Sequence, residues 1–128
     1  MFASKHISLT AIAALALVPA AASAKHGGDR GVRVAGSCDH GVTSKLKLKN
    51  DDGVIEVEFE VDQNRVGKRW RVTFKRNGST VFRSIRTTQA PSGSFEARRL
   101  LAGGAGTRIV ATAKSLSSGE TCRAAISF

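Results

Sequence analysis

Strict alternation of apolar and polar residues occupies two neighbouring parts of the chain, residues 54–61 and 69–75. The apolar positions are Ile55, Val57, Phe59 and Val61 in the first part, and Trp70, Val72 and Phe74 in the second. Successive side chains of a strand point to opposite faces, so each part predicts a β-strand with one apolar face and one charged face. We therefore expect Phe59, Trp70, Val72 and Phe74 to lie in the core.

Shorter segments of the same kind, separated by turn residues, predict strands at 32–38, 44–49, 79–88, 95–101, 108–116 and 121–128. Asn77-Gly78 is typical of a two-residue hairpin between the strand of residues 69–75 and the next one. In that next strand Val81, Phe82 and Ile85 do not share one face, which indicates a bulge or a sheet edge. Seven or eight short strands without helical periodicity predict an all-β antiparallel sandwich, and a small barrel is the competing form.

The first 24 residues have the parts of a secretory signal peptide. Lys5 and His6 form a basic start, residues 7–18 form an apolar run, and Ala22-Ser23-Ala24 is a small-x-small cleavage site. The run is shorter than the roughly 20 residues that a membrane helix needs, although a retained anchor is the alternative. We expect a secreted mature chain without a membrane span, with a flexible lead over 25–31 and a single domain over 32–128.

The only two cysteines, Cys38 and Cys122, lie near the two ends of the predicted domain. An even number of cysteines in a secreted chain favours a disulfide. We therefore predict one bridge between the first and last strands. Bridged sulfurs are neither nucleophiles nor metal ligands, so catalytic cysteine chemistry is not expected.

Lys and Arg number 20 against 10 Asp and Glu, and the formal net charge is +10 at pH 7. Such a chain is attracted to anionic surfaces in a salt-dependent way. Aromatic platforms for bases are few and Phe82 alone is expected to be exposed, so specific nucleic-acid binding is not expected. The candidate contact residues for a polyanion or a partner are Lys45, Lys47, Lys49, Arg69, Arg71, Lys75, Arg83 and Arg86.

The charged faces of residues 54–61 and 69–75 allow two arrangements. If the two strands pair directly, Glu60 faces Arg71 and Glu56 faces Lys75. These residues would then form a ladder of cross-strand salt bridges, and each exposed pair would stabilise the fold by about 0.2–1 kcal/mol. If the strands lie in opposite sheets, there is no ladder, and one acidic and one basic face could support head-to-tail self-association. The strand count favours opposite sheets, and ordinary solvated faces are the preferred interpretation.

Candidate chemistry is sparse in this sequence. Glu56, Glu58 and Glu60 resemble paired catalytic carboxylates, but they lie on an open strand face among cations. Cys38-Asp39-His40 resembles a fragment of a metal site without a second cluster, and His26 belongs to the predicted lead. The chain after residue 24 has only two histidines to serve as bases, so we expect no enzyme, no metal and no cofactor.

The pattern resembles a bacterial immunoglobulin-like or fibronectin type III-like sandwich. Trp70 occupies the third main strand, where such folds place a buried aromatic, and residues 108–124 are similar to their last hairpin. The mature chain departs from the family in lacking tyrosine and in the position of its cysteines. The resemblance implies no catalytic residues.

These observations favour a secreted, non-catalytic binding module at the bacterial cell exterior. Its expected partner is an anionic cell-wall polymer or another secreted or surface protein. The alternative is a soluble cationic effector, such as a small protein inhibitor or a toxin that acts on another protein or on a membrane.

Overall fold

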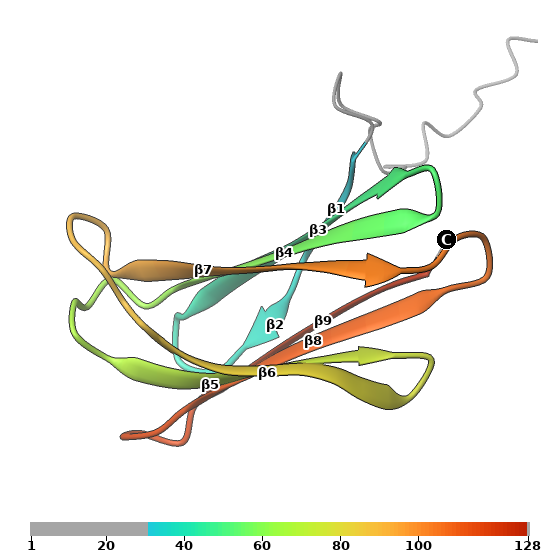
Figure 1. Cartoon of the computed structure of the whole chain (residues 1–128). Helices are drawn as coiled ribbons and strands as arrows, with labels where there is room; N and C mark the ends of the chain where they lie inside the picture. Colours follow the sequence, from blue (N-terminus) through green and yellow to red (C-terminus); the bar gives the residue numbers. More distant parts are fainter. Residues whose placement is uncertain (1–30, 128) are drawn as a thin grey trace, which may run out of the picture.

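The computed structural model describes residues 31–127, which form nine β-strands in two antiparallel sheets that pack face to face (Figure 1). The strand order is β1-β3-β4-β7 in the four-stranded sheet and β2-β9-β8-β5-β6 in the five-stranded sheet. The strands are β1 (Gly31–Ala35), β2 (Ser37–Cys38), β3 (Thr43–Asp51), β4 (Val54–Asp62), β5 (Arg69–Arg76), β6 (Ser79–Thr87), β7 (Ser94–Ala102), β8 (Arg108–Ser115) and β9 (Thr121–Ser127). The expected all-β antiparallel sandwich is confirmed. The predicted signal at 1–24 and residues 25–30 of the predicted lead lie outside the described residues.

The core lies between the two sheets, on the apolar faces that the alternating segments supply. The expected core residues Phe59, Trp70, Val72 and Phe74 are all fully buried. The Phe59 and Phe74 rings meet edge to face with their centroids 6.4 Å apart, which joins the two sheets through β4 and β5. Trp70 Nε1 donates a hydrogen bond to Gln63 Oε1 at 3.0 Å, so the one polar atom of this indole has a partner.

The first expected strand, 32–38, is divided between the two sheets at Gly36, and this accounts for the ninth strand. β1 pairs with β3 in one sheet, and β2 pairs with β9 in the other. The Gly36 amide donates to the Ser44 carbonyl at 2.9 Å, and a Cβ at Gly36 would collide with Ser44 Oγ. Glycine therefore lets the chain cross closely over β3 as it changes sheets.

The β5–β6 hairpin forms as predicted at Asn77-Gly78. Both residues have positive φ, 48° and 86°, as the preferred two-residue hairpin turn requires. The pairing register of β5 and β6 shifts between Phe74 and Lys75, and β6 is an edge strand of its sheet. The bulge and the edge position, which the sequence offered as alternatives, are therefore both present.

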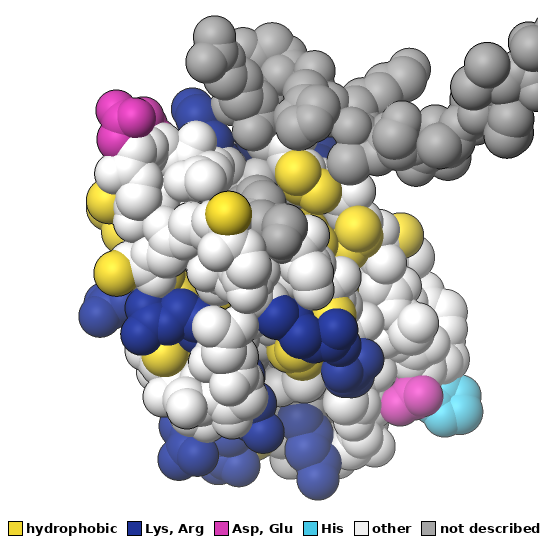
Figure 2. Space-filling view, turned by 90° about the vertical axis from the view of Figure 1, so that its right-hand side faces the viewer, with side chains coloured by type: hydrophobic (Ala, Val, Ile, Leu, Met, Phe, Trp, Pro, Cys, Tyr) yellow, Lys and Arg dark blue, Asp and Glu magenta, His cyan; other side chains and the backbone are white. Residues whose placement is uncertain are grey.

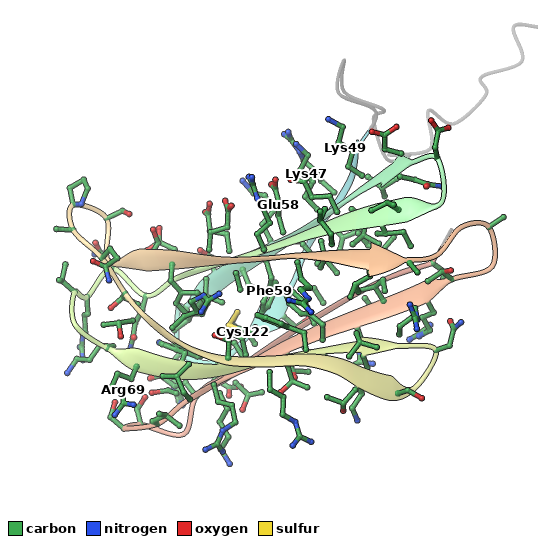
Figure 3. All side chains as sticks on the ribbon, viewed as in Figure 1. Lys47, Lys49, Glu58, Phe59, Arg69 and Cys122 are labelled. Carbon is green, nitrogen blue, oxygen red and sulfur yellow. A yellow bond between two sulfur atoms is a disulfide. The ribbon has the colours of Figure 1, made fainter. Side chains whose placement is uncertain are left out.

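The predicted disulfide is also confirmed, since Cys38 in β2 is bonded to Cys122 in β9. The two residues are direct register partners, and Cys122 lies among the buried core residues (Figure 3). A disulfide is compatible with an oxidising, extracellular location. Within residues 31–127, no helix is long and apolar enough to cross a membrane.

Candidate functional site

Within residues 31–127, the solvent face of the five-stranded sheet carries cations and no carboxylates. We call this surface the basic face, and it consists of Arg69, Arg71, Lys75, Arg83, Arg108, Lys114 and Arg123. All seven residues are exposed, and none of the five strands contains Asp or Glu. In Figure 2 the lower part of the molecule, which is the side of this sheet in Figure 1, shows a gathering of Lys and Arg side chains.

Alternation and register bring the cations of the basic face together. Trp70, Val72 and Phe74 fill the inner face of β5, so Arg69, Arg71 and Lys75 must face solvent. Arg71 is the register partner of Lys114 on β8, and Thr73 lies opposite Arg83 on β6. On the far side, Thr112 of β8 is the partner of Arg123 on β9. Threonine hydroxyls therefore lie in the middle of the face with cations around them.

Among the residues that the structure describes, no carboxylate lies on the basic face to balance its cations. Like charges that lie directly opposite on neighbouring strands destabilise a sheet, and Arg71 and Lys114 are such a pair. The cations Arg71 and Arg83 lie beside each other at a shallow hollow on this surface. An anion bound there would remove repulsion that the folded chain otherwise retains.

The solvent face of the four-stranded sheet is different, because its cations lie opposite carboxylates on the neighbouring strand. β4 and β5 lie in opposite sheets, as we expected. The row of Glu56, Glu58 and Glu60 on β4, which we call the Glu row, therefore does not meet the cations of β5. The row is paired instead with the lysines of β3, in the register Lys49 with Glu56, Lys47 with Glu58 and Lys45 with Glu60. Figure 3 shows Lys47, Lys49 and Glu58 pointing away from this sheet, on the side opposite Arg69.

Arg98 of β7 completes this mixed surface. Its guanidinium lies 2.7 Å from a carboxylate oxygen of Glu58, 3.3 Å from one of Glu56 and 3.4 Å from one of Glu96. The acidic patch that head-to-tail self-association would need is therefore neutralised within its own sheet. Lys45, Lys47 and Lys49 are separated from the basic face by the whole sandwich, so they do not belong to the same contact surface.

Arg86 also lies away from the basic face. It is the register partner of Trp70, so its side chain starts on the inner side of the β6 edge. There its guanidinium carbon lies 5.9 Å from the centre of the Phe82 ring, and that of Arg99 from β7 lies 5.8 Å from the same ring. Phe82 is half-buried and stacks on Phe74 with ring centres 4.9 Å apart, so it is not the open aromatic that we expected.

Sequence reasoning missed Arg108, Lys114 and Arg123 as members of the basic face. The available signal was the alternation of β8 and β9, in which Ile109, Ala111, Ala113 and Cys122 are buried and the cations occupy the positions between. That alternation places them on the outer side of their strands. It could not show that β8 lies next to β5.

The carboxylates of the four-stranded sheet include one with an altered pKa. Burial raises the pKa of Glu58, and so do a hydrogen bond with Glu56 and the charge of Glu96, whereas Arg98 and Lys47 act in the opposite direction. Glu58 belongs to a structural network on an open sheet surface, so this shift does not by itself define a catalytic acid.

Residues 38–40 do not assemble a metal site. Cys38 is bridged, and Asp39 Oδ2 accepts a hydrogen bond from the Thr121 amide at 2.9 Å. Within residues 31–127, no three or more His, Cys, Asp and Glu side chains are grouped so as to hold a metal ion. Asp39 therefore ties the β2–β3 loop to the start of β9.

Comparison of the chain with protein-family models, with curated proteins and with solved structures finds no significant match in any of the three.

Proposed function

We propose that this chain is a secreted, non-catalytic binding module of immunoglobulin-like type that acts at the bacterial cell exterior. Its contact surface is the basic face, and its ligand is an anionic polymer such as an acidic polymer of the cell wall. The observation that carries the proposal is the positive charge of this surface, because seven exposed cations gather on a five-stranded sheet whose strands contain no Asp or Glu.

An extended ligand suits the shape of this surface better than a small molecule. The cations are spread over β5, β6, β8 and β9, and the hollow among them is shallow. Small-molecule sites are usually concave and largely apolar, whereas a polymer can contact many separated cations at once. Each contact releases counterions, so the affinity should fall steeply as salt increases.

The proposal is tested with two triple variants of equal charge. Arg69→Gln, Arg71→Gln and Lys75→Gln remove three cations from the basic face, and Lys45→Gln, Lys47→Gln and Lys49→Gln remove three from β3. Retention on a phosphate-rich anionic matrix is measured across a salt gradient. We expect the β5 variant to elute at clearly lower salt than the β3 variant. The reason is that the β3 lysines lie opposite glutamates of β4, whereas the β5 cations have no carboxylate on the neighbouring strands.

Equal elution of the two variants would show that net charge governs retention, and the proposed contact surface would then be wrong. Stoichiometric, salt-insensitive capture of one purified protein, without retention on the anionic matrix, would contradict the polymer as ligand. Circular dichroism of both variants shows whether each remains folded.

A further inference from the structure

The outer edge of β6 exposes backbone groups that the sheet does not use. β6 pairs with β5 on one side only, and within the described residues no strand is hydrogen-bonded to its other side. The Ile85 carbonyl accepts from its neighbour Ser84 Oγ at 3.4 Å, and the Thr87 carbonyl accepts from Gln89 Nε2 at 3.1 Å. These two carbonyls, which would accept from a neighbouring strand inside a sheet, accept instead from side chains one or two residues away.

The positions of the unused groups follow from the antiparallel pattern. The Thr88 amide donates to the Lys68 carbonyl at 2.8 Å, so the backbone of Thr88 points toward β5. Residues of an antiparallel strand alternate between pointing at one neighbour and pointing at the other. Arg83, Ile85 and Thr87 therefore point their N–H and C=O groups away from β5, and they lie beyond the bulge in the regular part of the hairpin.

Arginines surround this edge on both sides. Arg83 and its neighbour Arg71 lie on the solvent side, and Arg86 and Arg99 lie on the inner side over the Phe82 ring. β6 itself contains no acidic residue. Charges of one sign on an edge strand oppose pairing with an identical edge, because two copies would bring these arginines together.

We propose that β6 is a strand-addition site for an extended, acidic peptide segment of a partner protein. The segment forms backbone hydrogen bonds with Arg83, Ile85 and Thr87, and its alternating side chains reach the arginines on the two sides of the edge. Backbone pairing then supplies affinity, and the four arginines select acidic over neutral or basic sequences. This site goes beyond the polymer-binding function and lies at the border of the basic face.

The experiment uses the full chain with its disulfide intact and a labelled peptide with Glu at neighbouring positions, so that Glu side chains lie on both faces of the extended peptide. One control peptide carries N-methyl groups on the amides of its bonding edge, and another has Lys in place of Glu. The protein variants are Ile85→Pro, which removes an unused edge N–H and keeps every charge, and Ile85→Val, which keeps that N–H. Proline is tolerated where an edge N–H faces solvent, so the sheet should still form.

We expect the acidic peptide to bind the wild type and Ile85→Val alike, and to bind Ile85→Pro about tenfold or more weakly, because backbone bonds are lost. Amide exchange should slow at Ile85 and Thr87 when the peptide is bound. Equal binding of the N-methylated peptide, or of Ile85→Pro, would overturn strand addition in favour of simple charge attraction. If amide exchange at Ile85 and Thr87 slowed as the protein concentration was raised in the absence of peptide, a second copy of the chain would be pairing with β6. That result would also overturn the proposal.

Retention of the same protein samples on the anionic matrix tests the polymer-binding function separately. Ile85→Pro keeps every cation of the basic face, so its retention on the anionic matrix should equal that of the wild type. Failure of peptide binding with normal retention rejects only the strand-addition site, and the reverse result rejects only the polymer-binding function.

Discussion

Removing the disulfide should lower the free energy of unfolding by about 4–5 kcal/mol. The bridge joins residues 84 positions apart, and the chain-entropy model gives roughly that amount for a loop of this length. Domains of about this size are stable by only about 5–15 kcal/mol, so the loss is a large fraction of the total. The variant Cys38→Ala with Cys122→Ala, or the reduced wild type, provides the perturbation.

The structure adds a local consequence. β2 has only two residues, and its place beside β9 depends on the bridge and on few other bonds, among them the Asp39 amide to the Thr121 carbonyl at 3.2 Å. Without the bridge, amide exchange at Asp39 and Thr121 should accelerate more than exchange in the centre of β5. The ends of the domain should therefore open before the core does.

Urea unfolding followed by tryptophan fluorescence measures the global effect, since Trp70 is the only tryptophan of the chain and is fully buried. Oxidised and reduced samples are compared at the same pH and temperature. A difference below about 1 kcal/mol would refute the loop-entropy reasoning. Free thiols in the oxidised, folded protein would refute the bridge itself.

Three further predictions concern single side chains. Trp70→Ala should cost about 3–5 kcal/mol because it removes a fully buried aromatic, and a wild-type unfolding midpoint would contradict this. Gly93 has a φ of 72°, and an added Cβ would collide with the Arg65 backbone, so Gly93→Ala should cost at least about 1 kcal/mol. Gly119→Ala, where φ is also 72° but a Cβ meets open space, is the matched control, and equal losses would disprove the steric cause. Because the pKa of Glu58 is raised, the folded state holds its proton more tightly than the unfolded state, whose pKa is about 4.3. The Glu58 contribution to stability is therefore greatest below that pH and is lost as the pH rises through the folded-state pKa. The stability of wild type minus that of Glu58→Gln should accordingly fall as the pH rises above about 4.3, and a constant difference in urea midpoints would count against the shift.

Much of the fold could be predicted because a strand has a period of two. Burial of Phe59, Trp70, Val72 and Phe74 follows directly from their alternation with charged residues, and it needs no knowledge of the partner strands. The Asn77-Gly78 turn is equally local, because both residues tolerate positive φ. The disulfide could be predicted because the chain has only two cysteines.

The candidate site could be predicted only in part. Arg69, Arg71, Lys75 and Arg83 do share one surface, but Lys45, Lys47 and Lys49 face the opposite way and are matched by the Glu row of β4. Arg86 differs from Arg83 because an odd number of positions separates them on one strand, which reverses the face.

The apolar side of each strand, the main turns and the single disulfide can all be predicted locally, since each depends on neighbouring residues or on the number of cysteines. The strand partners cannot: the assembled sheets show that β5 lies beside β8, that β4 lies between β3 and β7, and that the chain crosses from one sheet to the other at Gly36. Strand partners are selected by packing between segments far apart in sequence. The alternation within a single strand therefore does not show which strands lie beside it. The charge of each face of the molecule therefore emerged only when the strands were assembled into sheets.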